Sequence, residues 1–352
     1  MPMGKLVHLY SIVVPVYNRP DELKLLLDSV AVQQCENDFE VVVVEDGSQL
    51  SSRQVCEQST IFSKITYLEK SNSGPGLSRN YGMKSAKGDY FIILDSDCIL
   101  PTNYLSEVDR ELSTQYADFF GGPDSALASF TPIQQAVNLV MTASLSTAGI
   151  RGGEPNYFEP RSFNMGLSKE VFKATGGFGA IHPGEDPDLV MRAWKLGYKS
   201  RLFSNALVYH QRRIQFSSFF KQVFKFGSVR PILEVLHPEF KRPIYKGPSL
   251  FLMYLITVVV LFVTMLLGQI SFQLTALLCA PLVVYLGVFK LQLIYKTRSI
   301  KLTSLAILAF FIQMSGYGLG YLRSSILLVL NRDKPIETLF PHLFFNPINK
   351  GQ

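Results

Sequence analysis

Two aspartates separated by one residue follow an apolar stretch of the chain. The stretch 90–94 (YFIIL) carries no charge and is followed at once by Asp95, Ser96 and Asp97. Two carboxylates so close together are costly in a sheltered position unless a cation neutralises them. Oxygen ligands suit Mg²⁺ or Mn²⁺, and such an ion also stabilises a departing diphosphate. The pair therefore indicates a divalent metal site for phosphate chemistry, with a plain polar turn as the alternative.

A second acidic cluster lies at residues 184–189 (GEDPDL), where we expect a helix that runs to about Gly197. The positive end of a helix favours acidic side chains for structural reasons alone. That explanation covers the charge, but it does not explain why the cluster follows the glycine-rich GGF at 176–178. Glu185 and Asp186 are therefore candidates for chemistry.

The elements that must position these residues alternate between strand and helix. Apolar runs at 11–17, 39–45, 64–68 and 90–94 predict strands, and 74–86 predicts a helix that opens at GPG. Asn18 is a candidate cap for a helix after the first strand, with Pro20 in its first turn. This order predicts an α/β fold with a doubly wound, mainly parallel sheet. Asn18, Asp46 and the aspartate pair then all lie at carboxyl ends of strands, where such folds bind ligands.

The composition places this domain beside a membrane. The formal net charge is +6, and residues 212–246 contain eight Lys and Arg against only Glu234 and Glu239. A basic segment before an apolar one suits an anionic membrane surface, although a solvated helix face is the alternative. The four cysteines show no metal or disulfide spacing. Because the amino terminus runs at once into a strand, we expect no signal peptide and a catalytic part in the cytoplasm.

The last third of the chain is apolar enough to cross a membrane. We predict three spans, at 249–268, 272–289 and 302–322, with the basic stretch 290–301 as a cytoplasmic loop. Gly316, Gly318 and Gly320 permit close helix packing. Residues 331–352 are expected to be a polar tail, and the side of the membrane on which they lie is left open.

Two segments are expected to lie at the membrane interface and to handle an acceptor. Residues 130–148 are apolar but interrupted, and 216–236 mix five phenylalanines with lysine. For the second segment we favour an amphipathic surface helix over an ordinary core-packing helix. The domains expected are therefore 1–211 for catalysis, 212–248 as a basic interfacial segment, 249–330 in the membrane and 331–352 as the tail.

Five stretches in order resemble family 2 glycosyltransferases of the GT-A fold: SIVVPVYNRPDEL, VVVVEDGSQ, GPGLSRNYGMKSAKGDYFIILDSDC, FNMGLSKEVFKATGGF and GEDPDLVMRAWKLGY. The resemblance implies a nucleotide and donor site formed by Pro15, Tyr17, Asn18, Asp46, Arg79, Asp95 and Ser96. It implies Mn²⁺ or Mg²⁺ held by Asp97 and Asp95, with His210 as a further candidate ligand. It implies Asp186 as the general base on the acceptor hydroxyl, with Glu185 beside it. The acceptor side is assigned to Asn164, Met165, Gly177 and Phe178.

The resemblance implies an inverting, metal-dependent hexosyltransferase of the cytoplasmic membrane. We expect a nucleotide-sugar donor, with UDP favoured over GDP and TDP, a lipid-linked or saccharide acceptor for a cell-surface glycan, membrane lipids as partners and no nucleic acid. Because the QxxRW pattern of processive synthases is absent after His210, single additions are favoured. Transfer to polyprenyl phosphate and an inactive membrane scaffold are the alternatives. A sugar nucleotidylyltransferase is disfavoured because PVYNRPDE lacks a glycine-rich phosphate loop. The sugar, linkage and oligomeric state stay open.

Overall fold

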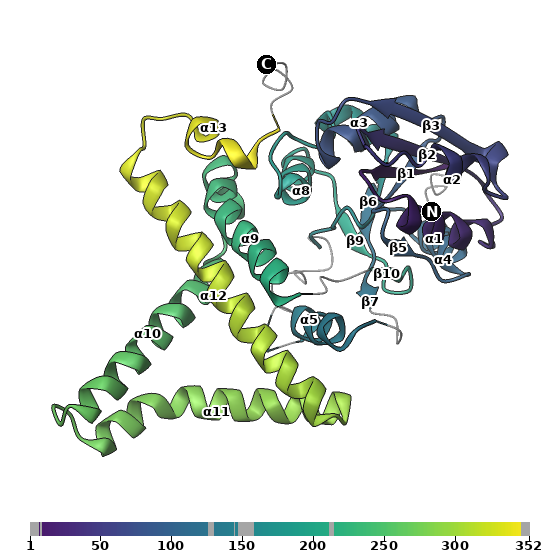
Figure 1. Cartoon of the computed structure of the whole chain (residues 1–352). Coiled ribbons are helices and arrows are strands. Elements are labelled where there is room, and N and C mark those ends of the chain that lie inside the picture. The colour runs from purple at the N-terminus through teal and green to yellow at the C-terminus, as the bar shows by residue number, and fades with distance from the viewer. Residues whose placement is uncertain are drawn as a thin grey trace. The chain divides into compact units, whose positions relative to one another are not determined.

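The computed structural model describes residues 7, 9–125, 130–143, 145–146, 158–210 and 215–345. The chain divides into two compact units. The first consists of Met1–Leu127, Arg151–Gln211 and Phe340–Gln352, and the second consists of Ala128–Ile150 and Arg212–Leu339. We call them the sheet unit and the helical unit (Figure 1). The division differs from the predicted domains in two places. Part of the segment 130–148 groups with the later helices, and the end of the expected polar tail returns to the sheet unit.

The sheet unit is built on seven strands in the order β3-β2-β1-β4-β8-β6-β9. Their bounds are β1 Leu9–Val16, β2 Asp38–Asp46, β3 Ile65–Lys70, β4 Tyr90–Leu94, β6 Phe119–Gly121, β8 Asn164–Ser168 and β9 Ser200–Leu202. All neighbours pair in parallel except those of β8, which is antiparallel to both β4 and β6. The predicted α/β class with a mainly parallel sheet is therefore confirmed, as are the four predicted strands.

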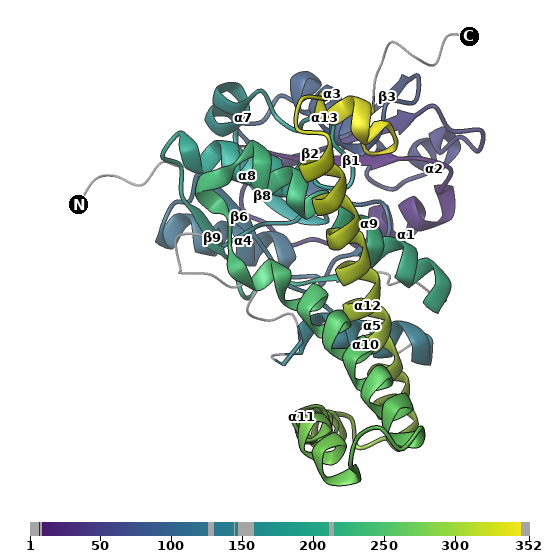
Figure 2. The same ribbon diagram turned by 90° about the vertical axis from the view of Figure 1, so that its left-hand side faces the viewer.

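Helices cover both faces of this sheet, which is why β1, β2 and β4 are almost continuously apolar. On one face α1 (Pro20–Ala31) and α4 (Tyr104–Thr114) pack against alternate residues such as Ile12 and Val14. On the other face lies α3 (Pro75–Ser85), where a side chain at Gly82 would overlap Val13 (Figure 2). The absence of a side chain at Gly82 thus lets α3 approach the sheet closely.

The start of α1 differs from the prediction. Arg19 is the N-cap residue and makes no side-chain cap bond. Asn18 instead has a φ of 54°, in the left-handed region that asparagine tolerates, and its side chain reaches across to the loop after β2. The Asn18 Oδ1 accepts hydrogen bonds from the amides of Gln49 at 2.8 Å and Leu50 at 3.0 Å. Asn18 therefore ties together the ends of two neighbouring strands.

Shorter elements complete the sheet unit. A second sheet has the order β5-β10-β7, formed by Cys98–Ile99, Val208–His210 and Asp124–Ser125. The remaining elements are α2 (Arg53–Glu57), α7 (Lys169–Thr175), α8 (Glu185–Lys195), η1 (Phe62–Lys64) and η4 (Pro341–Leu343). The predicted helix at 184–197 is thus present as α8.

The helical unit is organised around the long helix α12 (Ile300–Leu330). The other elements are α5 (Pro132–Thr142), α9 (Phe216–Leu236), η2 (Pro238–Phe240), η3 (Pro243–Lys246), α10 (Gly247–Leu266), α11 (Phe272–Thr297) and α13 (Ile336–Leu339). Among the described residues three helical stretches are long and apolar enough to cross a membrane: Pro243–Leu266, Phe272–Thr297 and Ile300–Leu330. The predicted basic loop at 290–301 is mostly helical, because α11 continues to Thr297 and α12 starts at Ile300.

The three glycines of α12 allow neighbouring backbones to approach closely. A side chain at Gly318 would overlap the Pro248 carbonyl of α10, and one at Gly320 would overlap the Phe224 carbonyl of α9. Helix α9 therefore buries a face against α12, with Phe219 fully buried, while Phe220 and Phe226 remain exposed. The expected surface helix thus has a packed face as well, and its contact with lipid stays a prediction.

Candidate functional site

The buried guanidinium of Arg79 brings the two acidic motifs together. Arg79 lies on α3, and its side chain is only 4% exposed. Its NH2 donates to Asp95 Oδ1 at 2.7 Å, and its NH1 pairs with Glu185 Oε1 at 3.4 Å. The Phe178 ring lies 5.2 Å from the guanidinium and covers it. Residues that are far apart in the sequence thus form one charged site at the carboxyl edge of the sheet.

Glu185 and Asp186 differ in their surroundings although they are adjacent. The His182 Nδ1 lies 2.9 Å from Glu185 Oε1. Burial raises the pKa of Glu185, but the His182 contact and the Arg79 charge outweigh burial and hold its pKa below the ordinary value. Burial, followed by the charge of Glu185, raises the pKa of Asp186 to about 6. One carboxylate therefore stays ionised, and the other is tuned to exchange a proton near neutral pH.

One carboxylate oxygen of Asp186 has no hydrogen-bond partner among the residues that the structure describes. Its Oδ2 accepts a hydrogen bond from the Ser162 amide at 3.1 Å. Its Oδ1 is buried and accepts no hydrogen bond from the described residues. Arg161, which pairs with Glu159 at 2.7 Å, adds a positive charge that opposes the rise in the Asp186 pKa. A carboxylate with one oriented oxygen and one unpartnered oxygen is suited to accept a proton from a bound hydroxyl.

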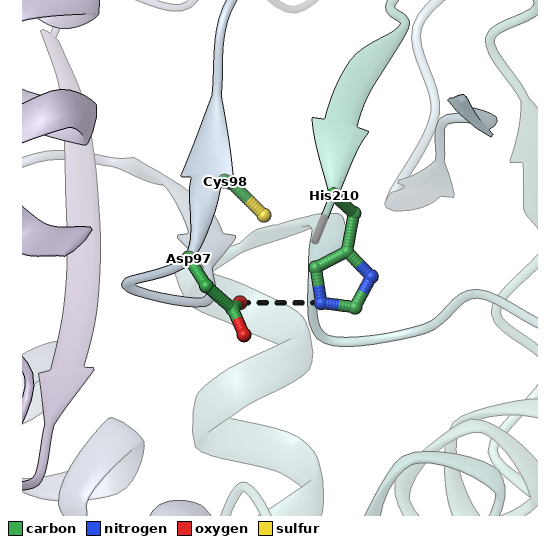
Figure 3. A group of neighbouring side chains, drawn as sticks. All are labelled: Asp97, Cys98 and His210. Carbon is green, nitrogen blue, oxygen red and sulfur yellow. Dashed lines mark ion pairs between the residues drawn. The ribbon is translucent and has the colours of Figure 1, made fainter. Parts of the chain in front are cut away.

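Asp97 and His210 form a separate pair, which Figure 3 shows with the two side chains facing each other. The antiparallel pairing of β5 and β10 sets Cys98 opposite His210, so Asp97, which directly precedes β5, lies beside the imidazole. The His210 Nε2 is 3.2 Å from Asp97 Oδ1, and the Arg19 NH1 is 2.6 Å from Asp97 Oδ2. Burial raises the pKa of Asp97, but His210 and Arg19 outweigh burial and hold that pKa well below its ordinary value.

The candidate ligand atoms around Asp97 suit a hard divalent metal ion. Asp97, Cys98 and His210 offer ligand atoms within 4.8 Å of one another. Burial raises the pKa of the Cys98 thiol well above its usual value, and this thiol donates to the Phe163 carbonyl at 3.3 Å. Cys98 is therefore a packed thiol, which leaves a carboxylate and an imidazole as the ligands. Mn²⁺ and Mg²⁺ accept such partial sets and complete them with phosphate oxygens and water.

The structure separates the two aspartates that the sequence paired. Asp95 turns to Arg79, whereas Asp97 turns to His210, and the candidate ligand group among the described residues contains only Asp97 of the two. The imidazole Nδ1 also lies 3.9 Å from Asp124 Oδ2, and the Phe163 ring stacks on the imidazole at 4.9 Å. His210 is thus held from three sides, which makes it a stronger candidate ligand than Asp95.

The carboxylate of Asp46 holds the loop between β3 and α3, here called the donor-side loop because it lies next to the expected nucleotide site. Its Oδ1 accepts from the Lys70 ammonium at 2.6 Å and from the Ser73 amide at 2.9 Å. Its Oδ2 accepts from the Gly74 amide at 2.9 Å and from the Asn72 side chain at 3.4 Å. A carboxylate offers about four acceptor positions. Because the four hydrogen-bond donors fill these positions, Asp46 can accept a hydrogen bond from a nucleotide base only if one of them leaves.

Three other residues expected at the nucleotide site lie at the same edge of the sheet. Tyr17 is 52% exposed just after β1, and Pro15 is partly buried at the end of that strand. Ser96 is buried between the two aspartates. Of these three, only Tyr17 presents a large exposed surface on which a planar base can stack.

The four residues assigned to the acceptor side have packing roles in the structure. Asn164 is fully buried: its Nδ2 donates to the Ala206 carbonyl at 2.7 Å, and its Oδ1 accepts from the Tyr104 hydroxyl at 2.7 Å. Met165, Gly177 and Phe178 are buried as well. All four residues therefore pack in the interior of the sheet unit, and their role on the acceptor side stays a prediction.

Sequence reasoning missed Arg19, Lys70 and His182. Arg19 pairs with Asp97, Lys70 with Asp46 and His182 with Glu185. Lys70 ends β3, next to the end of β2, so its position could have been found from strand order. His182 lies three residues before Glu185, and nothing in that spacing marks a contact because the segment before α8 is irregular.

Comparison with known proteins shows similarity to glycosyltransferases. Residues 11–176 match the profile of the family described as Glycosyl transferase family 2. An uncharacterized glycosyltransferase of Haemophilus influenzae is 30% identical over 189 residues, which are 52% of this chain and 60% of that protein. The poly(ribitol-phosphate) β-N-acetylglucosaminyltransferase TarS of Staphylococcus aureus is 32% identical over 112 residues, 31% of this chain and 20% of that protein. The matched region thus spans less than two thirds of either relative.

A solved structure supports the fold. The mannosyltransferase PcManGT from Pyrobaculum calidifontis, in complex with GDP-Man and Mn²⁺, matches with a TM-score of 0.53. The match covers 94% of this chain and 89% of that chain at 13% identity. At this identity the likeness shows the fold alone, and it agrees with the GT-A fold expected from the sequence.

Proposed function

We propose, on the premise that the amino-terminal domain belongs to glycosyl transferase family 2, that the chain is a metal-dependent inverting glycosyltransferase. Its donor is a nucleotide sugar, with a UDP-sugar as the first candidate. Its acceptor is a lipid-linked or membrane-proximal saccharide of a cell-surface glycan. The observation that carries the proposal is that Arg79 pairs with two acidic side chains. One is Asp95, on the expected nucleotide side, and the other is Glu185, next to the candidate base.

Asp186 is the proposed general base. A base that operates near neutral pH needs a pKa close to that pH, and the pKa of Asp186 is raised to about 6. Its Oδ1 accepts no hydrogen bond from the described part of the chain, so that oxygen is available for the acceptor hydroxyl. Glu185 is the proposed positioning neighbour: its charge raises the pKa of Asp186, and Arg79 and His182 hold it in place.

Asp97 and His210 are the proposed ligands for Mn²⁺ or Mg²⁺. An ion held by these two side chains would supply positive charge that stabilises the leaving diphosphate. Arg19 contacts Asp97 Oδ2 and adds a second positive group on the diphosphate side. Asp95 is proposed to orient Arg79 towards the donor. Pro15, Tyr17, Asn18, Asp46 and Ser96 remain the proposed nucleotide side.

The helical unit supports the proposed acceptor class. Many side chains of α10 and α11 are apolar and exposed, including Leu250, Leu277 and Val283 at 62%, 69% and 68%. Surfaces of this kind are stable in lipid and unfavourable in water. The excess of Lys and Arg at 212–246 favours the cytoplasmic face of the membrane, where nucleotide sugars are made. An acceptor anchored in the same membrane is therefore favoured over a soluble one.

Donor turnover tests the proposal. Detergent-purified protein is offered UDP, GDP, TDP and CMP sugars with Mn²⁺ or Mg²⁺, and nucleotide release is measured before and after addition of a chelator. Release from one donor class that stops on chelation supports a metal-dependent transferase. Release that persists with chelator contradicts the metal role. No release, together with no nucleotide binding, supports the inactive scaffold.

A further inference from the structure

The residues after the last candidate span return to the sheet unit. The segment Phe340–Phe345, here called the C-terminal segment, reads FPHLFF and buries Phe340 and Leu343 completely or nearly so. The Leu343 carbonyl accepts a hydrogen bond from the His182 amide at 2.7 Å. The Phe345 amide donates to the Ala180 carbonyl at 2.9 Å, and Phe344 forms an antiparallel bridge with Ile181. The C-terminal segment thus fixes the backbone just before α8.

The side chain of Phe345 contacts both sides of the site. Its ring centroid lies 5.6 Å from that of His182. It also fills the space next to Gly74, where even a single added carbon atom would overlap the ring. Gly74 has a φ of 91° and donates its amide to Asp46, so it belongs to the donor-side loop. Phe345 therefore lies between the donor-side loop and the segment that carries His182.

His182 links the position of Phe345 to the acidic pair Glu185 and Asp186. Its Nδ1 contacts Glu185 Oε1 at 2.9 Å, and the same oxygen faces Arg79 NH1 at 3.4 Å. The His182 side chain is 39% exposed. A half-exposed imidazole is held in one orientation only when something packs on it, and here the ring of Phe345 does so. Any shift of His182 alters the setting of Glu185, which is bonded to the next residue, Asp186.

We propose that Phe345 is a positioning residue: the C-terminal segment docks beside the site, and its phenyl ring holds His182 against Glu185. The role rests on the transferase function proposed above, because it concerns the geometry next to the base. It makes the chain after the membrane spans part of the working enzyme. Phe345 is expected to influence the chemical step more than donor binding. Its ring packs on the His182 side chain, whereas the Gly74 amide that bonds Asp46 keeps this hydrogen bond without the ring.

Phe345→Ala removes the ring and keeps the backbone bonds of the segment. We expect kcat to fall about 10-fold, with the donor KM and direct nucleotide binding within about 2-fold, because small misplacements near a reacting group slow the chemical step. Phe345→Leu, which keeps most of the apolar volume, should recover part of kcat. His342→Ala changes an exposed side chain of the same segment and is the control. An unchanged kcat in Phe345→Ala, or an equal loss in His342→Ala, overturns the proposal.

A double-mutant cycle tests whether Phe345 acts through His182. His182→Ala removes the contact with Glu185, and His182→Asn retains a donor near the Nδ1 position and should recover part of kcat. If Phe345 acts through His182, the double variant Phe345→Ala/His182→Ala should be no slower than His182→Ala alone. If the losses in kcat of the two single variants multiply in the double variant, the two residues act independently. That result would overturn the proposal that Phe345 acts through His182.

Amide exchange separates this inference from the proposed function. The His182 amide donates a hydrogen bond to the Leu343 carbonyl of the C-terminal segment. Its hydrogen exchange should therefore be faster in Phe345→Ala than in His342→Ala. This readout needs no activity. If the wild-type chain turns over no donor, the proposed function fails, whereas equal exchange at His182 in the two variants overturns the docking of the segment.

Discussion

Replacement of Asp186 by asparagine removes the proposed base with little change in shape. General-base catalysis contributes roughly 10²- to 10⁴-fold to rate, so kcat should fall by that factor, equivalent to about 3–5 kcal/mol in the barrier. The nucleotide and metal contacts are made by other residues, so nucleotide binding should stay within about 2-fold of wild type. Asp28→Asn, which alters an exposed carboxylate on α1, is the matched control.

The pH dependence of wild-type activity gives the same test without a mutation. In the proposed mechanism the carboxylate form of Asp186 is the active one, and burial with the charge of Glu185 raises its pKa to about 6. Activity in kcat/KM should therefore be level above about pH 6 and fall about tenfold per pH unit below it. Arg79, Arg161 and the Ser162 amide face the same carboxylate and oppose the rise.

Stability should respond in the opposite direction. Because the folded-state pKa of Asp186 lies above its unfolded value, ionising this carboxylate costs stability as the pH rises through about 6. Asp186→Asn should therefore raise the melting temperature at pH 8. This gain should be much smaller near pH 4, where the folded carboxyl is protonated and the unfolded one, with its ordinary pKa of 3.8, is about half protonated. Nucleotide release, calorimetric nucleotide binding and thermal unfolding across pH 4–9 measure these effects. A variant with more than a tenth of wild-type kcat, or a pH profile that is flat through pH 6, refutes the assignment of the base.

Three further predictions concern other parts of the chain. Arg79→Gln should reduce kcat at least 100-fold, because it unpairs Asp95 and Glu185; activity within tenfold of wild type would argue against a shared site. His210→Ala should weaken Mn²⁺ binding, measured by calorimetry, at least tenfold, and unaltered binding would remove His210 from the ligands. Gly320→Ala should lower the melting temperature, because the added carbon meets the α9 backbone, whereas Gly287→Ala in open space should not; equal effects would contradict the packing at α12.

The central strands of the large sheet were predictable because burial of both faces requires a continuous run of apolar residues in the sequence. Runs such as VVVV in β2 and YFIIL in β4 have no polar face, and only strands covered by helices on both sides need such runs. Strands that are short or flanked by irregular chain gave no such signal. For this reason β8 was not predicted, although it is the one strand of the large sheet that runs antiparallel to its neighbours.

The motifs were predictable, but their partners were not. In a strand, two residues separated by one other share a face, so spacing alone would place Asp95 and Asp97 together. Residues 95–97 instead form the turn between β4 and β5, and the two carboxylates have different partners. Asp95 instead meets Arg79 from α3, and Asp97 meets His210 from β10. These contacts depend on how distant segments fold back, which no local pattern records. The buried contacts of Asn164 were missed for the same reason, because its partners Tyr104 and Ala206 lie far away in the sequence.

The end of the chain shows how composition can mislead. Residues 331–352 contain enough charged and polar residues for the whole stretch to read as a tail, and the apolar group at 339–345 is too short to predict an element. Its role is visible only once Phe344 is paired with Ile181. Helix α9 was likewise interpreted from its aromatic and basic residues, while its contact with α12 depends on glycines about 90 residues further along the chain.

Transfer of labelled sugar from nucleotide to lipid tests the central claim most directly. Wild-type protein and Asp186→Asn are incubated with the preferred labelled donor, Mn²⁺ and a lipid extract of cell membranes, and the organic phase is counted. If the chain is a transferase with Asp186 as its base, label should enter lipid with wild-type protein, stop on chelation and be nearly absent with the variant. Label that stays in the nucleotide, or that reaches lipid equally with both proteins, would contradict the proposed function.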